Sequence, residues 1–319
     1  MTARGGAASG ADVERRSLRL GAKLATGGQG HIHELLDEPG LLFKEFYNGS
    51  PDSHALFALV GERLRLSPAD RAMLDSQAAW PLCRVTEGGR ATGFLMNRVP
   101  DAFTWRTSGG NARLTEAQYL LRPPKPAFQS VPQPTPEERL ELVRAYVALL
   151  DRLHDWGLVF GDISHANLLW SIAPVPAVHL IDCDGVRRMG GNPVLPQADT
   201  PDWDDPLVSQ SRPTLDSDRY KMALLVVRVL ARNAYARPGE AWFPVPGVLN
   251  DRQLSAVTRL LTQAAGAAGT RPDMRQWAAA LSDRKVIPLM RPVPRQPLSV
   301  DDAMLDDSPS ARRSIRLRP

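Results

Sequence analysis

The sequence has few cysteines and no long apolar segment. Its two cysteines, Cys83 and Cys183, cannot build a disulfide framework, so we expect a reducing compartment. No apolar run approaches the ~20 residues that span a bilayer. The best candidate, ALLVVRVLA, carries Arg228 in its middle, and the first residues, MTARGGAASGADVERR, lack the apolar core of a secretory signal. These absences predict a soluble, cytoplasmic protein that does not bind a membrane.

The body of the chain also lacks an excess of positive charge. The formal net charge is +4, from 39 basic and 35 acidic residues. Residues 284–319 hold eight basic and four acidic side chains and therefore account for the whole excess. A near-neutral body does not predict a positively charged surface that binds nucleic acid. We expect no nucleic-acid partner.

What the sequence does contain is an ordinary globular balance with unevenly placed proline. Apolar residues make up 43% and charged residues 23%, which excludes wholesale disorder. Of the 28 prolines, six lie in 121–136 and six in 284–319, so the excess marks linkers. We expect residues 1–14 to be a disordered N-terminus and residues 284–319 a disordered tail rich in proline and arginine.

Strand-like runs come first in the chain and helix-like segments follow. From Leu18 to Val99 the runs are strand-like and broken by glycines, with one helical stretch near Ser53 to Leu66, and 100–134 is irregular. Thr135, Pro136 and Glu138 are typical of a capped helix start. The further helices are expected at 217–231, 251–265 and 273–282. This order predicts an α+β fold with a small antiparallel-sheet lobe over 15–99 and a larger helical lobe over 100–283.

The first segment that carries chemistry is LATGGQGHI, residues 24–32. Glycines there let a backbone approach a phosphate closely, and the amides of a tight turn favour an anion. By itself this segment favours a plain hairpin turn.

The second segment is LLFKEF, residues 41–46, which places Lys44 inside an apolar, strand-prone run. Such a lysine commonly sits on a solvated face. Its alternative role is to hold the α- and β-phosphates of ATP, oriented by a carboxylate from a neighbouring helix. Glu62 lies 18 residues later in the one helix-like segment nearby.

Two acidic segments complete the set. In GLVFGDISHANLLW, Asp162 and Asn167 are five residues apart in a short loop, where a carboxylate can face an attacking hydroxyl and an amide oxygen can bind a metal. In AVHLIDCDGV, an apolar strand ends in Asp182 and Asp184, which suit a hard cation such as Mg²⁺. Each segment taken alone is also typical of a turn.

The order of these elements resembles that of protein kinases. Within the bacterial protein-kinase-like superfamily, the chain resembles a divergent group whose genes often accompany tellurium-resistance-type or phosphatase genes. The segments that carry the resemblance are AAWPLCRV, GGRATGFLMNRVP, FGDISHANLL, LIDCDGV and SDRYKMALL, within residues 18–283. It implies a two-lobed kinase fold, ATP and Mg²⁺ as cofactors, a protein substrate, and a phosphatase as a candidate partner.

The resemblance also implies roles for individual residues. Lys44 would contact phosphates and pair with Glu62, Asp162 would accept the proton of the substrate hydroxyl, and Asn167 and Asp182 would bind Mg²⁺. Asp218 would brace the catalytic loop, and Arg271 would pair with Asp204 or Asp205. The positions expected around the nucleotide are Gly27, Gly28, Gly30, Ile32, Met96, Asn97 and Val99.

Several positions depart from the family pattern. Ala25 replaces the first loop glycine, and Phe160-Gly161 stands where His-Arg usually precedes the catalytic aspartate. Ser164 replaces a lysine, and Cys183-Asp184 replaces Phe-Gly. The proton acceptor and metal ligands are retained, so the sequence predicts a Ser/Thr kinase. A small-molecule kinase of the aminoglycoside or choline type, and a non-catalytic nucleotide-binding scaffold, are the alternatives.

Overall fold

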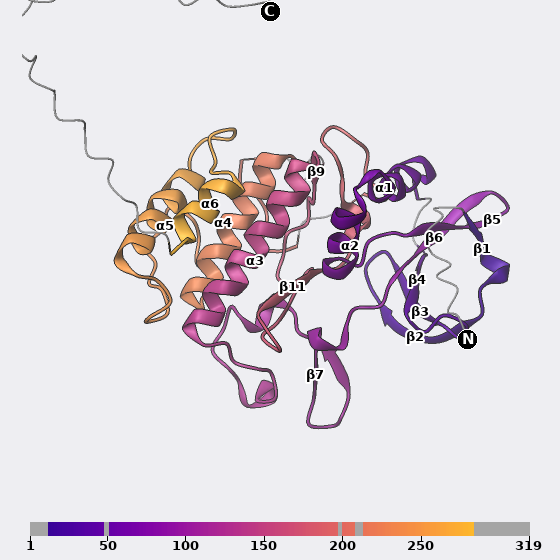
Figure 1. Cartoon of the computed structure of the whole chain (residues 1–319), viewed down its shortest axis with the longest axis horizontal. Helices are drawn as coiled ribbons and strands as arrows, with labels where there is room; N and C mark the ends of the chain where they lie inside the picture. Colours follow the sequence, from indigo (N-terminus) through magenta and orange to yellow (C-terminus); the bar gives the residue numbers. More distant parts are fainter. Residues whose placement is uncertain (1–11, 48–50, 197–199, 208–212, 284–319) are drawn as a thin grey trace, which may run out of the picture. The chain divides into compact units, whose positions relative to one another are not determined.

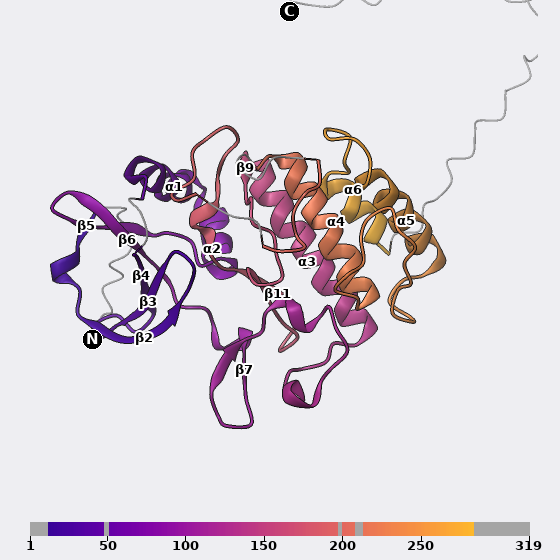
Figure 2. The same ribbon diagram turned by 180° about the vertical axis from the view of Figure 1, so that it is seen from behind.

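A computed structural model describes residues 12–47, 51–196, 200–207 and 213–283. The described residues up to Ser282 belong to one compact unit. The expectations for residues 1–11 and for the tail at 284–319 lie outside the described residues. Figures 1 and 2 show the unit from opposite sides, with the largest sheet formed by the first part of the chain and the longest helices by the later part.

A six-stranded sheet is formed within residues 13–97. Its strand order is β1-β5-β6-β4-β3-β2, and every neighbouring pair is antiparallel except β1 with β5, which is parallel. The expected antiparallel sheet is thus a mixed one. The strands are β1 (Val13–Glu14), β2 (Leu20–Thr26), β3 (Gly30–Leu35), β4 (Leu41–Phe46), β5 (Cys83–Glu87) and β6 (Arg90–Asn97).

The expectation of disorder up to residue 14 is wrong for its last residues. Val13 and Glu14 pair with Val85 and Thr86, and the Arg84 guanidinium donates hydrogen bonds of 2.8 and 2.6 Å to the Asp12 carboxylate. Val13 also packs against a small apolar cluster on one face of the sheet. Burial of this side chain, together with the added strand, offsets the entropy of ordering these residues.

Two helices, rather than the single one expected, lie between β4 and β5. They are α1 (Ser53–Arg65) and α2 (Pro68–Gln77). Asp52 caps α1 and Ser67 caps α2, where Pro68 occupies the first turn. Leu74 is the one fully buried apolar side chain of this short helix, so few apolar positions mark it in the sequence.

Residues 100–134 form little regular structure, as expected, apart from a short hairpin of β7 (Thr104–Arg106) and β8 (Ala112–Leu114). Three short 3-10 helices lie in the same segment: η2 (Asp101–Phe103), η3 (Ala117–Tyr119) and η4 (Pro126–Phe128). The hairpin was not predicted.

The four later helices form close to where the sequence predicts them. Thr135 and Glu138 make the reciprocal hydrogen bonds of a capping box at the first of them. Helix α4 is buried along nearly its whole length and lies beside α3 in both views. The four are α3 (Pro136–Asp155), α4 (Leu215–Ala231), α5 (Asp251–Ala264) and α6 (Met274–Leu281). No helix of the described segments is long and apolar enough to span a bilayer.

Short strands between α3 and α4 hold the two acidic segments side by side. In the antiparallel hairpin of β10 and β11, Leu168 is paired with Leu180. The Ile181 amide donates a 3.0 Å hydrogen bond to the Asn167 carbonyl. The loop before β10 and the segment after β11 therefore emerge at the same end. The strands here are β9 (Leu158–Val159), β10 (Leu168–Ser171), β11 (Ala177–Leu180) and β12 (Arg187–Arg188), with η5 (Cys183–Gly185) before β12.

Candidate functional site

Lys44 is a buried lysine at the centre of the sheet. Strand β4 lies between β3 and β6, where Lys44 is paired with Ile32 on one side and Phe94 on the other. The residue is only 6% exposed, and its Nζ lies 5.9 Å from the centre of the Phe94 ring. A solvated or snorkelling lysine is therefore excluded. A buried ammonium needs partners that compensate for its desolvation.

The partners of Lys44 come from the segment after β11. Its Nζ lies 2.6 Å from Asp184 Oδ1 and 3.2 Å from Asp182 Oδ1. Burial favours the neutral amine, but the two carboxylates outweigh this effect and raise the pKa of Lys44. The lysine is charged at neutral pH and ties the sheet to a segment about 140 residues later in the chain.

The two aspartates have different surroundings. The Asp184 side chain is 3% exposed and that of Asp182 is 56% exposed. Asp182 also has a left-handed backbone, with φ of 54° and ψ of 43°, which is uncommon for a residue other than glycine. Asp184 neutralises the lysine from inside, whereas the Asp182 carboxylate is open to a ligand.

Asp162 and Asn167 contact each other in the loop before β10. The Asn167 amide nitrogen donates to Asp162 Oδ2 at 2.7 Å and to the Asp162 carbonyl at 3.0 Å. Burial raises the pKa of Asp162, although the Lys221 charge and the hydrogen bonds from Asn167 and Thr200 oppose the increase. A carboxylate with a raised pKa is suited to accept a proton.

Thr200 also reaches this carboxylate, a contact that sequence analysis did not predict. Its Oγ1 donates a hydrogen bond of 3.2 Å to Asp162 Oδ1. Thr200 is 38 residues away in the chain, so only the fold reveals the contact. It places the hydroxyl of a later segment on the expected proton acceptor.

Asp218 has the bracing role that the resemblance implied. Its buried carboxylate accepts hydrogen bonds from the amides of Phe160 at 2.8 Å and Gly161 at 2.9 Å, and it lies 3.2 Å from His154 Nε2. Gly161 has a φ of 82°, a conformation that strongly favours glycine. The backbone that leads into Asp162 is thus held by α4.

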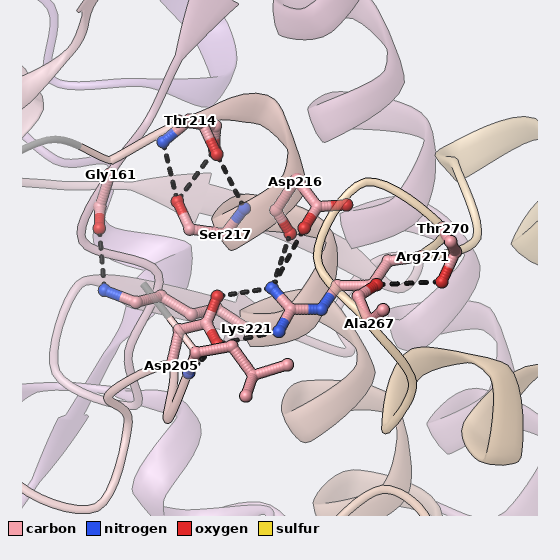
Figure 3. Close-up of polar contacts among 10 residues, drawn as sticks. Gly161, Asp205, Thr214, Asp216, Ser217, Lys221, Ala267, Thr270 and Arg271 are labelled. Atoms are coloured by element: carbon pink, nitrogen blue, oxygen red, sulfur yellow. Dashed lines mark hydrogen bonds and ion pairs between the residues drawn. The ribbon is translucent and has the colours of Figure 1, made fainter. Parts of the chain in front are cut away.

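Arg271 pairs with Asp205, one of the two partners expected. Both residues are buried, and two hydrogen bonds join the guanidinium to the carboxylate. Asp216, in the first turn of α4, lies 3.1 Å from the same guanidinium (Figure 3). The pair fixes the segment after Thr200 against α4 and the loop that precedes α6.

The expected pair of Lys44 with Glu62 is absent, and this prediction is wrong for the structure. Glu62 accepts hydrogen bonds of 2.7 and 2.6 Å from Arg188 and lies 2.7 Å from Arg65. Burial opposes ionisation of Glu62, but the hydrogen bonds from Arg188 and Arg65 outweigh it and lower the pKa. Lys44 is paired with Asp182 and Asp184 instead.

The glycine segment forms the turn between β2 and β3. The Gly27 amide donates to the Gly30 carbonyl at 2.9 Å, and the Tyr47 hydroxyl donates to the Gly27 carbonyl. A Cβ at Gly30 would lie 2.4 Å from the Glu45 carbonyl oxygen, so this position needs glycine for strand pairing. Gly30 therefore has a structural role whether or not a phosphate binds nearby.

The remaining nucleotide positions lie on and after the strands around Lys44. Ile32 pairs with Lys44 itself, and Met96 and Asn97 pair with the first two residues of β4. Val99 follows the end of β6. Ile32 and Met96 both pack in the main apolar core, on the same side of the sheet as Lys44. The sheet therefore brings the expected nucleotide positions close to Lys44. Glu62, which was expected beside Lys44, binds Arg188 instead.

The residues expected to hold Mg²⁺ fit that ion in type. Asp182 offers an exposed carboxylate and Asn167 an amide oxygen, and Mg²⁺ binds through one or two such groups with phosphate and water oxygens. Within the described ranges, no group of three or more histidine, cysteine, aspartate or glutamate side chains is placed to hold a metal. The donor set therefore suits an ion shared with a bound phosphate rather than one held by the protein alone.

Comparison of the chain with protein-family models gives no match, and comparison with curated proteins gives no significant relative.

Proposed function

We propose that this protein transfers a phosphoryl group from ATP, with Mg²⁺, to a serine or threonine hydroxyl of a protein, and that its sheet and helices are the two lobes of a protein-kinase-like fold. One observation carries the proposal. Lys44 contacts Asp182, 138 residues later in the chain, next to the partly buried Asp162–Asn167 pair. A phosphate-binding cation, an exposed metal-binding carboxylate and a proton acceptor are the groups that this reaction requires.

Each group has a role that its environment supports. The Lys44 ammonium neutralises phosphate charge, and Asp184 keeps it in place from the buried side. Asp182 and Asn167 would hold Mg²⁺, which would supply positive charge to offset the charge that develops on the transferred phosphate. The acceptor hydroxyl attacks the terminal phosphorus, ADP leaves, and the hydroxyl proton passes to Asp162.

The contacts around Asp162 favour a protein acceptor. Asp205 and Arg271 fix the segment that carries Thr200, and this segment lies directly beside Asp162. A fixed chain segment beside the proton acceptor can position an extended peptide so that its hydroxyl also reaches Asp162. The side-chain hydroxyl of Thr200 shows that a threonine in a polypeptide segment can reach Asp162 Oδ1.

Incubation of the protein with ATP, Mg²⁺ and a panel of proteins, peptides and small alcohols tests the proposal. Mass spectrometry should find phosphate on serine or threonine of a protein or peptide. Phosphate on a small alcohol alone would replace the protein substrate with a small molecule. Absence of transfer to every acceptor, despite nucleotide binding, would leave a nucleotide-binding scaffold.

A further inference from the structure

Arg122 and Tyr235 form a pair of exposed side chains at the protein surface. The Arg122 guanidinium lies 5.8 Å from the centre of the Tyr235 ring, and the tyrosine is 70% exposed. Over the described ranges, no carboxylate comes within ion-pair distance of Arg122. A guanidinium over an aromatic ring keeps the N–H donors at the edge of its own plane available for a ligand. The pair therefore presents an uncompensated cation to solvent.

The chain segment that leads to Arg122 lies beside the candidate catalytic loop. Glu116 forms an antiparallel bridge with Leu169 of β10, and its carbonyl accepts a 3.0 Å hydrogen bond from the indole of Trp170. Strand β10 begins at the residue after Asn167, where the loop ends. The segment with Arg122 thus starts next to the strand that follows this loop.

A buried arginine anchors the same segment to α4. Arg139 donates hydrogen bonds to the Leu120 carbonyl at 2.8 Å and to the carbonyl of Val229, near the end of α4, at 2.9 Å. Leu120 is itself fully buried. The backbone just before Arg122 is therefore fixed against the end of the helix that precedes the tyrosine's loop.

A second buried arginine fixes the loop that carries Tyr235. Arg228, on α4, donates to the Ala236 carbonyl at 3.1 Å and to the Asp202 carbonyl at 2.8 Å. Asp202 lies two residues after Thr200, whose hydroxyl contacts the expected proton acceptor. The exposed pair is thus held by two segments that both adjoin the acceptor side of the candidate site.

The local charge favours an acidic ligand for this pair. Lys125, three residues after Arg122, is a second exposed cation with no carboxylate at ion-pair distance in the described part of the chain. Arg237, in the tyrosine's loop, lies 3.9 Å from the Asp202 carboxylate, so its charge has a partner. Unmatched cations on one short segment of a near-neutral body select a ligand of opposite charge.

We infer that Arg122, backed by the Tyr235 ring, is a specificity-determining residue that binds an aspartate or glutamate of the acceptor protein. The acceptor serine or threonine then lies in a chain segment that carries an acidic residue nearby. One carboxylate can accept two N–H donors of a guanidinium at once. The inference rests on the proposed function for its effect on turnover, whereas binding of an acidic peptide at Arg122 can be measured without turnover.

The effect on turnover is measured with peptides that hold one threonine and carry glutamate, glutamine or lysine at one flanking position at a time. With the full chain, ATP and Mg²⁺, wild type should prefer glutamate to glutamine at one position by about three- to fivefold in kcat/KM, the scale of a solvated ion pair. The preference should appear in KM, because the contact is away from the reacting atoms. It should shrink as the salt concentration rises.

Variants at the two positions test the assignment. Arg122→Gln should abolish the preference for glutamate, and Arg122→Glu should reverse it, so that lysine is preferred at the same position. Tyr235→Phe should keep the preference, because the ring remains, whereas Tyr235→Ser should weaken it. Arg90→Gln is the matched control. Arg90 is an exposed arginine at the start of β6, and its loss should leave the preference unchanged.

Fluorescence anisotropy with labelled forms of the same peptides, without ATP, separates the inference from the proposed function. An active wild type with no preference for glutamate at any position, or with one that persists in Arg122→Gln, would overturn the inference and leave the proposed function standing. An inactive wild type that binds the glutamate peptide more tightly than the glutamine peptide, with the difference lost in Arg122→Gln, would do the reverse. Neither transfer nor a difference in binding would contradict both.

Discussion

The Glu62 carboxylate binds the Arg188 guanidinium through two hydrogen bonds, of 2.7 and 2.6 Å. This contact joins α1 to β12, 126 residues apart in the chain. It holds Glu62 away from Lys44, whose charge is balanced by Asp184 instead. Helix α1 is thus joined to β12 by a partly exposed ion pair, which is sensitive to pH.

The stability that Glu62 contributes should be lost in acid. Burial opposes ionisation of Glu62, but hydrogen bonds from Arg188 and Arg65 outweigh it and lower the pKa in the folded state. The contribution is therefore present above the unfolded pKa of about 4.3 and disappears as the pH falls through the lower folded value. Urea unfolding should show Glu62→Gln less stable than wild type by about 1 kcal/mol at pH 7, because Arg188 is half exposed. The difference should shrink as the pH falls below the unfolded pKa of Glu62.

Glu141→Gln is the control for that measurement. Glu141 is half exposed and pairs with Arg144 one turn later on α3. Its removal should change the stability by only a few tenths of a kcal/mol at either pH. A Glu62→Gln effect that is independent of pH would mean that the ion pair is not its cause.

Removal of the buried Arg271 should be severe. Arg271→Met leaves the Asp205 carboxylate buried without its partner, which typically costs about 3–5 kcal/mol. The double variant with Asp205→Asn should lose less than the sum of the two single changes. Arg275→Met, which breaks an exposed pair with Asp155, should cost less than about 1 kcal/mol. Additive losses in urea unfolding would contradict the coupling of Arg271 with Asp205.

Thr200→Val should weaken catalysis with little effect on the fold. The change keeps the shape of the side chain and removes the hydrogen bond to Asp162, which is worth about 1 kcal/mol or slightly more because the acceptor is charged. We expect kcat to fall by about five- to tenfold and nucleotide affinity to stay constant. Thr262→Val, at an exposed hydroxyl of α5, should leave both unchanged. Equal kcat for both variants would remove Thr200 from the site.

Local signals predicted the helices well and long-range partners poorly. The α3 start could be predicted because Thr135, Pro136 and Glu138 form a capping box within four residues. Helix α2 was missed because only Leu74, with the partly buried Met73, marks its contact with the core. The partner of Glu62 could not be predicted, because the choice between Lys44 and Arg188 depends on which carboxylate already neutralises the lysine.

The sequence predicted the acidic residues of the candidate site but not the residues from distant segments that contact them. Asp162 and Asn167 are five residues apart, so one loop brings them together, and Asp218 was found through the resemblance. Thr200 and Lys221 act across the fold and leave little trace in the local pattern. The lysine in the apolar run of α4 was nevertheless a detectable signal. A helix that is apolar on all sides is buried, so its polar residues are buried too.

Asp182→Ala should abolish the Mg²⁺-dependent stabilisation of the protein by ATP. Asp182 is the exposed carboxylate at the site, and a ligand at 100 times its dissociation constant stabilises a protein by about 2.7 kcal/mol. Thermal unfolding with ATP, with and without Mg²⁺, measures the effect. Asp101→Ala, in the 3-10 helix after β6, is the control that should keep the full shift. An undiminished Mg²⁺-dependent shift in Asp182→Ala would exclude this residue from metal binding.

The most direct test of the account compares Asp162→Asn with wild type in ATP turnover and in ATP binding. The change keeps the shape of the side chain and removes the carboxylate that would accept the proton, while Lys44 and Asp182 would still hold the nucleotide. The account predicts that turnover falls by about 10² or more, the usual contribution of a positioned base, and that ATP affinity changes by less than about threefold. Equal turnover in Asp162→Asn and wild type, at unchanged ATP affinity, would contradict it.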